Sequence, residues 1–309
     1  NLPHVSQYKN LHQIIQMSKE KSSFLFVGLT VFAITKLSEF FETKLSKIAD
    51  YLIIDEAGQY GLANAVASAY FCENVILLGD QNQLPNVTQG SHPLNVGLSV
   101  MEFCLGSNTI VTENQGIFLS TTRRLHPKIC NYISECFYQS RLMPHENNNL
   151  KKITIDEDGI IKDLSGINLI ELNHEGCTQS SIEEQEYILH KINNLVENGK
   201  ITGEHISRTI SYEDIIVVAP YNNQVNGLID KLPNDVRIGT VDKFQGQEAP
   251  ICIISMTSSS INDAPRGIDF LLSSNRLNVA ISRAQISVFI FVSKYIFSAE
   301  AKSKEQMKL

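Results

Sequence analysis

Two carboxylates stand side by side directly after an apolar run of the sequence. Asp55 and Glu56 follow Tyr51–Ile54 with no residue between. A carboxylate in this place can hold Mg²⁺ through water, and a second one can polarise the water that attacks a nucleoside triphosphate. Acidic side chains are equally favoured at an ordinary solvated helix N-terminus. The pair by itself therefore leaves a triphosphate site and a plain helix start both open.

A second polar segment follows the apolar run Val75–Leu78. It is Gly79–Pro85, and it contains Asp80 and Gln83. In open parallel sheets, functional groups collect just past the carboxyl ends of the strands. The sequence thus places polar residues at such a position twice.

Arginines lie in two further segments, 121–127 and 275–284, which include Arg124 and Arg283. An arginine aimed at a γ-phosphate spreads the charge that builds on the transferring group. A single surface arginine is more often only a solvated charge. The small, polar loop Gly239–Glu248 is a further candidate, since its small residues would let backbone amides approach a phosphate or a sugar.

The elements that must position these residues can be predicted from hydrophobic patterning. Apolar runs without alternation predict strands buried on both faces. They are Phe24–Gly28, Tyr51–Ile54, Val75–Leu78, Ile167–Leu172, Ile215–Ala219, Ile251–Ser255 and Val288–Val292. Segments with helical spacing lie between them, namely Leu62–Phe71, Lys128–Phe137, Glu183–Val196 and Asn222–Lys231. Strands alternating with helices predict an α/β fold with parallel sheets flanked on both sides.

The number of predicted strands favours two α/β units. The best seam is Gly106–Gly116, where helical and strand periodicity are interrupted. We therefore predict a first unit over about residues 1–112 and a second over about 113–309. Within the second, the stretch from about 140 to 166 is rich in Asn, Asp and Gly and is expected to form an exposed excursion.

Composition excludes several classes of protein. The 309 residues carry 26 Lys and Arg against 33 Asp and Glu, a net charge of −7. This argues against a surface that binds nucleic acid all over, but not against a local groove. No apolar run approaches the roughly 20 residues that span a bilayer, so we expect no membrane partner and a cytoplasmic location, or a nuclear one in a eukaryote. The six cysteines form no CxxC pair, and most are expected to pack, reduced, as small hydrophobic residues.

Taken together and in order, these segments resemble those of the superfamily 1 helicases. The resemblance covers about Phe24 to Val292 and favours the branch that contains the nonsense-mediated decay helicase and the Dna2-type and Senataxin-type motors. The matching segments are DEAGQ at 55–59, GDQNQLP at 79–85, TRRLHP at 122–127, APYNNQ at 219–224, TVDKFQGQE at 240–248 and NVAISRA at 278–284. The resemblance implies two RecA-like P-loop NTPase units with parallel sheets, which bind ATP between them.

The family's functional residues carry over to matching positions. In the first unit, the resemblance implies that Asp55 holds Mg²⁺, that Glu56 is the base or orients the attacking water, and that Gln83 senses the γ-phosphate. It implies Arg124 and Arg283 as the two arginine fingers that reach the γ-phosphate.

The remaining carried-over residues contact the nucleotide or the strand. Gly246 and Glu248 are expected at the nucleotide, and Thr240 at the bound nucleic-acid strand. Thr30, which follows the run Phe24–Gly28, is expected to touch the sugar-phosphate backbone, although an ordinary strand end explains it as well.

The sequence departs from the family pattern at three positions. Asn86 replaces the second proline of the segment after Leu84, a position with a structural role. Thr122 replaces a glutamine, and Arg123 replaces the tyrosine whose ring lies against the nucleotide base. A guanidinium plane can also stack on a base, so Arg123 is a candidate for the same role.

No G-x-x-x-x-G-K-[ST] pattern occurs in these residues. That Walker A loop cradles the triphosphate, and in the family it precedes the element at Phe24–Thr30. We therefore expect the first unit to be truncated at its N-terminus, with further domains of the same protein upstream, and the chain alone to hydrolyse ATP poorly.

The function expected for the intact protein is an ATP- and Mg²⁺-dependent helicase that moves on single-stranded DNA or RNA. The alternative is a module that keeps the motor fold but binds nucleic acid or protein without hydrolysing nucleotide. A dinucleotide-dependent oxidoreductase is set aside, because no GxGxxG turn occurs.

Overall fold

The computed structural model describes residues 24–35, 47, 49–87, 90, 93–297 and 307. These residues form two compact units. Unit 1 takes its residues from 1–81 and 85–107, and unit 2 from 82–84 and 108–309. The change after Ser107 lies inside the predicted seam Gly106–Gly116. The segment Asn82–Leu84 joins unit 2 from within the range predicted for the first unit, because the side chain of Leu84 is buried in the core of unit 2.

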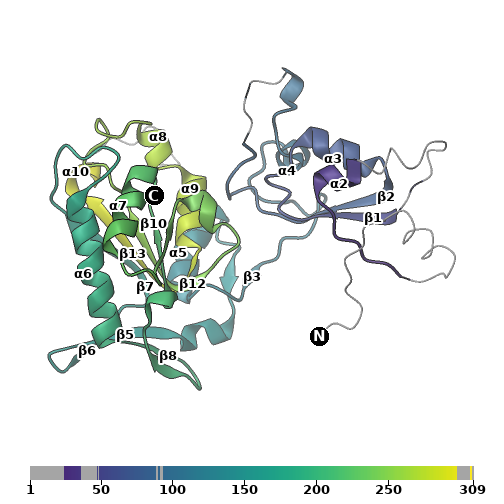
Figure 1. Ribbon diagram of the computed structural model, residues 1–309. Helices are drawn as coiled ribbons and strands as arrows, with labels where there is room; N and C mark the ends of the chain where they lie inside the picture. Colours follow the sequence, from purple (N-terminus) through teal and green to yellow (C-terminus); the bar gives the residue numbers. More distant parts are fainter. Residues whose placement is uncertain are drawn as a thin grey trace. The chain divides into compact units, whose positions relative to one another are not determined.

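Unit 2 is built on a parallel sheet of five strands in the order β11-β10-β12-β13-β7 (Figure 1). The strands are β7 (Gly166–Leu172), β10 (Ile215–Val218), β11 (Arg237–Gly239), β12 (Ala249–Ser255) and β13 (Ala284–Ser293). All but β11 coincide with predicted strands. β11 has only three residues, too few for a pattern to emerge.

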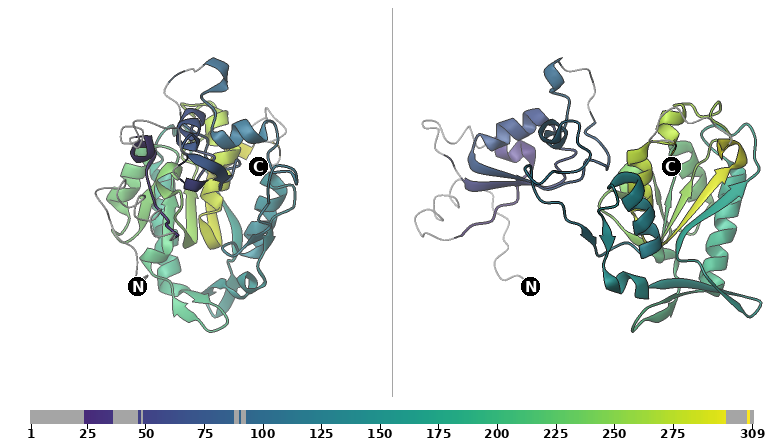
Figure 2. Two further views of the ribbon diagram at one scale, coloured as in Figure 1. Left: turned by 90° about the vertical axis from the view of Figure 1, so that its right-hand side faces the viewer. Right: turned by 180° about the vertical axis from the view of Figure 1, so that it is seen from behind.

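Helices cover both faces of this sheet, as the alternation of strands and helices predicts (Figures 1 and 2). The longer ones are α5 (Pro127–Phe137), α6 (Ile182–Asn198), α7 (Asn222–Lys231) and α9 (Ser274–Ile281). Short helical segments add α8 (Ile268–Leu271), α10 (Lys294–Phe297), η4 (Tyr212–Asp214) and η5 (Val241–Phe244).

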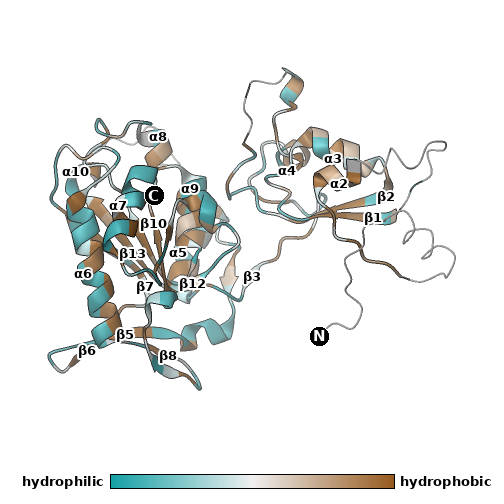
Figure 3. Cartoon of the chain, viewed as in Figure 1, coloured by the Kyte–Doolittle hydropathy of each residue, from teal (hydrophilic) through white to brown (hydrophobic). Residues whose placement is uncertain are grey.

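Successive side chains of the central strands enter two separate cores. Ile216 and Val218 of β10 pack in the core that includes α5 and α9, whereas Ile215 and Val217 pack in the core that includes α6 and α7. Because side chains alternate along a strand, both faces of β10 must be apolar. The prediction of burial on both faces is confirmed for β10, β12 and β13, which lie as apolar strands between half-polar helices (Figure 3).

The stretch predicted as an excursion carries regular antiparallel structure. A four-stranded sheet has the order β6-β5-β8-β9, and a short parallel pair joins β3 to β4. The elements are β3 (Thr121–Thr122), β4 (Met143–Pro144), η3 (Glu146–Leu150), β5 (Lys152–Glu157), β6 (Ile160–Asp163), β8 (Gly199–Thr202) and β9 (Ser207–Thr209). The side chains of Ile160 and Ile161 are exposed, as expected for a protruding hairpin.

Unit 1 contains two parallel strands, β1 (Ala49–Ile54) and β2 (Cys72–Leu77). They are accompanied by α2 (Val31–Thr35), α3 (Leu62–Ala69), η2 (Pro93–Asn95) and α4 (Val100–Leu105). Ile54 packs with Ala65 of α3 and Val100 of α4, but Tyr51 and Ile53 are more than half exposed. Burial on both faces is therefore a wrong prediction for β1 and β2, because the described helices of unit 1 leave one face of the pair uncovered.

The predicted strand Phe24–Gly28 is also corrected. Residues 24–30 form no helix or strand, and the side chains of Phe24 and Phe26 are exposed. A strand requires a partner that accepts and donates its backbone hydrogen bonds, and no described strand pairs with this segment. The fold class itself is confirmed, because both units are α/β with parallel sheets. Among the described helices, none combines the length and apolar character needed to cross a membrane.

Candidate functional site

The carboxyl ends of β1 and β2 bring the first two predicted segments together. Ile54 pairs with Leu77 in the parallel ladder, and the backbone N–H of Ala57 donates to the carbonyl oxygen of Leu78 at 2.8 Å. The loops after the two strands therefore run side by side within unit 1.

Two glycines allow this approach. A Cβ added to Gly58 would lie 2.9 Å from the carbonyl oxygen of Asp80, and one added to Gly79 would lie 2.9 Å from the backbone nitrogen of Ala57. Real Cβ atoms do not come so close to backbone atoms, so larger residues here would push the loops apart. The glycines fix the distance between the acidic pair and Asp80.

Asp55 and Glu56 are exposed at this edge. The Oδ1 atom of Asp55 accepts a hydrogen bond from the backbone N–H of Glu56 at 2.9 Å. Glu56 has a φ of 51°, a left-handed conformation that residues other than glycine seldom adopt. Such strain is concentrated at functional sites, and here it turns the Glu56 backbone directly after β1.

The acidic residues fit a magnesium ion. Mg²⁺ prefers oxygen ligands, keeps several waters and takes one or two protein carboxylates together with substrate phosphates. The exposed carboxylate of Asp55 matches that need. No group of three or more His, Cys, Asp or Glu side chains that could hold a metal occurs among the described residues, so an all-protein metal cage is not formed there.

Thr30 lies at the start of α2. Its carbonyl oxygen accepts hydrogen bonds from the backbone N–H groups of Ala33 and Ile34, and its hydroxyl accepts from Ala33 at 3.4 Å. The residue is exposed. This placement has a structural explanation as a helix start and leaves the predicted strand contact a prediction.

The backbone around Gln83 is held by side chains of α9. The amide nitrogen of Asn275 in α9 donates to the carbonyl oxygen of Gln83, and that of Asn278 donates to the carbonyl oxygen of Asn82 at 2.9 Å. Leu84 is buried next to them in the unit 2 core. The segment NRLNVAISRA thus positions the predicted sensor residue, although its two asparagines had no predicted role.

Arg124 and Glu248 are brought together, 124 residues apart in the sequence. The Nε atom of Arg124 donates to Oε2 of Glu248, and its Nη1 donates to the carbonyl oxygen of Ser282 at 3.4 Å. Gln285 donates to the other carboxylate oxygen of Glu248 at 2.8 Å. Both charged side chains stay partly exposed, at 34% and 42%, so a phosphate can reach the pair.

His126 and Gln285 tie this group to α5. The backbone N–H of His126 donates to the carbonyl oxygen of Gln285 at 2.8 Å, and its ring caps α5 by accepting from the N–H of Lys128. Burial, aided by the charge of Lys128, lowers the pKa of His126. The ring is therefore a neutral structural group beside Arg124.

Arg283 is buried, with 2% of its surface exposed. Its guanidinium donates to the carbonyl oxygens of Val279 at 3.0 Å, Gln247 at 3.0 Å and Phe244 at 3.3 Å. In this structure it therefore fastens the loop 241–248 to α9 instead of facing solvent. Its role as a second finger stays a prediction.

The other predicted residues of unit 2 lie at or near the same loop. Thr240 precedes η5 and is half-buried, and Gly246 is exposed with a φ of 75°. A Cβ on Gly246 would meet no described atom within 4 Å, so the backbone there is open to a ligand, and the positive φ favours glycine. Arg123 is exposed beside Arg124.

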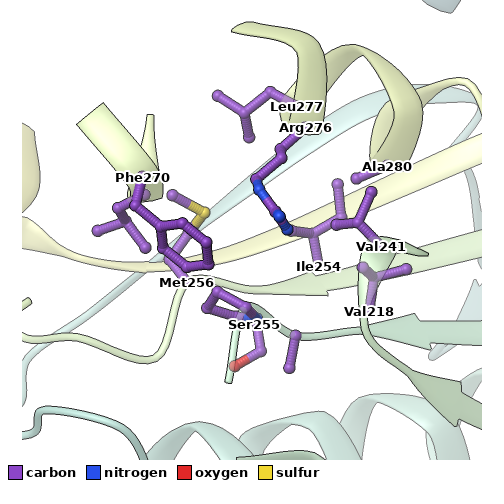
Figure 4. A pocket seen from close by; sticks show the side chains of 12 residues that line it. Val218, Val241, Ile254, Ser255, Met256, Phe270, Arg276, Leu277 and Ala280 are labelled. Carbon is purple, nitrogen blue, oxygen red and sulfur yellow. The ribbon is translucent and has the colours of Figure 1, made fainter. Parts of the chain in front are cut away.

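A small cavity of about 30 Å³ lies at the carboxyl edge of the unit 2 sheet (Figure 4). Val218 of β10 and Ser255 of β12 line it from below, and Arg276 reaches into it from α9 beside Phe270. The guanidinium carbon of Arg276 lies 4.6 Å from the ring centre of Phe270, and that of Arg266 lies 4.7 Å away. These are cation–π distances, and they place two positive charges around one ring.

A buried polar network next to this cavity was missed by sequence reasoning. Glu184 of α6 is fully buried and accepts hydrogen bonds from Ser255, His174 and the backbone of Thr257. Gln224 of α7, which the APYNNQ segment contains, donates to Ser255 at 3.0 Å. Glu184 lies in the first turn of a helix, where acidic residues are common, so the sequence carries no signal of its burial.

Three of the six cysteines, Cys72, Cys130 and Cys252, are buried as expected for residues that pack as small hydrophobic groups, whereas Cys104 is exposed. Burial raises the pKa of the Cys130 thiol to about 11. Burial raises that of Cys252 to about 12, with the Arg283 charge acting in the opposite direction. Thiols of this kind are not nucleophiles near neutral pH.

Comparison with known proteins identifies the family. A family model described as an AAA domain matches residues 98–295, more than half of the chain, and one described as the viral superfamily 1 RNA helicase core domain matches residues 30–105. The chain belongs to the superfamily 1 helicases. The resemblance in the sequence segments is thereby confirmed, and the protein is a helicase domain of this superfamily.

Among its relatives are three proteins of Schizosaccharomyces pombe. The helicase domain is 29% identical to helicase sen1 over 77% of this chain and 14% of that protein. It is 31% identical to DNA polymerase alpha-associated DNA helicase A over 76% and 36%, and 27% identical to the DNA replication ATP-dependent helicase/nuclease dna2 over 84% and 20%. The chain thus spans only 14% to 36% of the length of these relatives.

Among solved structures, the helicase domain is similar to that of PRRSV helicase. The likeness has a TM-score of 0.39 at 16% identity and covers 78% of this chain and 34% of the other.

Proposed function

We propose that this helicase domain is part of a motor that couples ATP hydrolysis to movement along single-stranded DNA or RNA. The observation that carries the proposal is the contact between Arg124 and Glu248. The two residues come from distant segments with predicted γ-phosphate and nucleotide roles, and the fold brings them into one partly exposed cluster. A scaffold protein has no need to bring these two residues together.

The proposed chemistry divides among named residues. Asp55 holds Mg²⁺, which neutralises charge on the triphosphate when it is bound. Glu56 orients the attacking water and accepts its proton, while Gln83 senses the γ-phosphate. Arg124 leaves Glu248 for the γ-phosphate and offsets the charge that develops there, a role in which arginine fingers contribute about 10³- to 10⁵-fold.

Arg283 adds a conformational requirement. Its guanidinium is held by three backbone carbonyls, so it reaches a nucleotide only after the loop 241–248 and α9 separate. This loop carries Gly246 and Glu248 and is preceded by Thr240. We therefore propose that nucleotide binding and strand binding both act on the Arg283 contacts.

Strand binding is proposed for Thr30 and Thr240, with Arg123 stacking on the nucleotide base. The names of two relatives include DNA helicase and DNA replication helicase/nuclease, which supports a nucleic-acid track. We propose a cytoplasmic location, or a nuclear one in a eukaryote, as the place of such work.

A second candidate function is a module that binds nucleic acid or protein without hydrolysing nucleotide. The burial of Arg283 favours it, because a guanidinium engaged with three carbonyl oxygens is not available to a phosphate. The substitutions at Thr122, Arg123 and Asn86 point the same way.

The deciding experiment measures ATP hydrolysis with and without single-stranded DNA or RNA. It compares the 309-residue chain with a longer version that extends upstream to a glycine-rich phosphate-binding loop. We expect strand-stimulated hydrolysis only in the longer version, and Glu56→Gln to reduce it by orders of magnitude while nucleotide binding survives. If neither version hydrolyses ATP while both bind strands, the second candidate is correct.

A further inference from the structure

Thr257, two residues after the end of β12, has an unusual backbone conformation. Its φ is 67°, in the left-handed region. A β-branched side chain is a genuine outlier there, because its Cβ substituents crowd the backbone. Such a conformation persists only where the surrounding structure imposes it.

Glu184 supplies that constraint. Both carboxylate oxygens of Glu184 accept the backbone N–H of Thr257 at 3.0 Å. Glu184 is fully buried, and its oxygens also accept from the hydroxyl of Ser255 and lie 3.2 Å from Nε2 of His174. Leaving a buried carboxylate, or one of its buried hydrogen-bond donors, without a partner costs free energy. The Glu184 carboxylate therefore holds these donors firmly in place.

The same network fastens the far end of the loop. The Nδ1 atom of His174 lies 2.8 Å from the hydroxyl of Ser259, and that hydroxyl also accepts the backbone N–H of Cys177 at 2.9 Å. Glu184 and His174 therefore hold the segment 255–259, which we term the β12 loop, at both ends.

The β12 loop forms part of the cavity at the carboxyl edge of unit 2. Ser255 and Met256 line the cavity, Ser255 below Phe270 and Arg276 and Met256 beside the Phe270 ring (Figure 4). Arg276 also forms an ion pair with Asp242, at 3.3 Å, in the segment that begins with Thr240. The shape of the loop therefore sets the support for the half-buried ring of Phe270 and for the two arginines that lie against it.

We propose that Glu184 is a positioning residue for nucleic-acid binding by unit 2. Its carboxylate holds Thr257 in the left-handed conformation and thereby keeps the β12 loop in the shape that supports Phe270 and Arg276 against a bound strand. The proposal rests on the proposed function, because it takes the carboxyl edge of unit 2 as a strand-binding surface. Glu184 itself does not touch the strand.

The test is a double-mutant cycle on the 309-residue chain, with Glu184→Gln, Thr257→Gly and both together. Glycine adopts a positive φ without help, so Thr257→Gly removes the need for the carboxylate.

Binding to fluorescent oligo-dT and oligo-rU is measured by anisotropy. We expect Glu184→Gln to weaken binding about tenfold, and the double variant to lie within about threefold of Thr257→Gly alone. Glu186→Gln, an exposed glutamate on the same helix, is the matched control and should bind like wild type.

Each other outcome has a definite meaning. If the double variant binds as weakly as Glu184→Gln, the carboxylate does not act through Thr257 and the proposal is overturned. If Glu184→Gln binds like wild type, the proposal fails while the proposed function stands.

If the wild-type chain binds no strand, strand binding by this chain fails, and with it the functional half of the proposal. The same cycle in thermal unfolding then tests the contact alone, because Thr257→Gly should recover part of the Tm lost in Glu184→Gln. Where Glu184→Gln is insoluble, Glu184→Asp replaces it in the cycle, since it keeps the charge but shortens the reach.

Discussion

At the scale of single residues, the positive charge of Arg124 is already paired with a carboxylate in this structure. Its guanidinium contacts the Glu248 carboxylate and the Ser282 carbonyl before any phosphate arrives. In the proposed function, a triphosphate must therefore displace one anion to gain this arginine. The exchange favours a group with more negative charge than a carboxylate, which is what a γ-phosphate offers.

Replacing Arg124 separates catalysis from stability. In the longer version that contains a phosphate-binding loop, we expect Arg124→Ala to lower strand-stimulated ATP hydrolysis by about 10³-fold. The free energy of unfolding should change by less than about 1 kcal/mol, because the ion pair is partly exposed. Steady-state hydrolysis and urea unfolding measure the two effects. Arg141→Ala, an exposed arginine that lies over Phe118, should leave hydrolysis unchanged, and a loss below tenfold in Arg124→Ala would contradict the assignment.

The sequence predicts a role for individual residues, but it does not predict their environments. The spacing of charged residues indicated Arg124 and Glu248 separately, yet no pattern shows that they contact each other. The burial of Arg283 depends on carbonyls of residues 244 and 247, whose positions follow from the path of a loop. Glu184 has the same local context as many solvated helix-start glutamates, so only the fold reveals its burial.

At the scale of elements, unit 1 depends on two loops that pack backbone against backbone. We expect Gly79→Ala to destabilise the unit by about 1–3 kcal/mol, because the added Cβ would lie 2.9 Å from the backbone nitrogen of Ala57. Urea unfolding followed by tyrosine fluorescence measures the change. Gly28→Ala is the control, since its Cβ would meet no described atom within 4 Å, and it should stay within about 0.5 kcal/mol of wild type.

A buried carboxylate between β9 and β10 gives this region a pH dependence. Burial alone would raise the pKa of Asp214, but hydrogen bonds from Arg208 and from Ser211 outweigh it and hold the pKa below its ordinary value of 3.8. A depressed pKa in the folded state stabilises the fold above the ordinary value, and this contribution disappears as the pH falls through the folded pKa.

Asp214→Asn should therefore cost about 2 kcal/mol of unfolding free energy at pH 7. The difference from wild type should shrink as the pH falls below the ordinary value of 3.8, where the unfolded chain binds the proton before the folded carboxyl does. Urea unfolding at several pH values from 7 to 3 checks this, with the exposed Asp235→Asn as control. A difference that is constant across this range would show that the charge of Asp214 does not matter.

Apolar runs located the elements well but their surroundings poorly. Runs without alternation predicted β10, β12 and β13 with burial on both faces, and the two helical layers of unit 2 provide it. The same pattern in β1 and β2 did not lead to the same burial, because the described helices of unit 1 cover one face only. An apolar run in the sequence indicates an apolar strand. Whether both faces of that strand are buried depends on the elements that pack against it.

At the scale of the whole molecule, the net charge of −7 limits the ways in which the proposed strand binding can occur. Binding by hydroxyls, backbone amides and one or two arginines displaces few counterions. We expect log Kd for oligo-dT to rise with log salt concentration with a slope below about 3, which corresponds to about four neutralised phosphates or fewer. A salt titration of strand binding measures this, and a slope above about 5 would reveal an extensive basic surface that the composition does not suggest.

The assignment of Asn82–Leu84 to unit 2 has a consequence for dissecting the protein into separate domains. A single cut after Ser107 would yield a piece, 108–309, without the leucine that fills part of its core and without the carbonyls to which Asn275 and Asn278 donate. Such a piece would expose the apolar surface against which Leu84 packs and would lose the two hydrogen bonds from α9 to this segment. We expect a synthetic peptide that spans Asp80–Asn86 to bind to this piece. The boundary between the units is therefore not a single position in the sequence, because Asn82–Leu84 lies between two segments of unit 1 and belongs to unit 2.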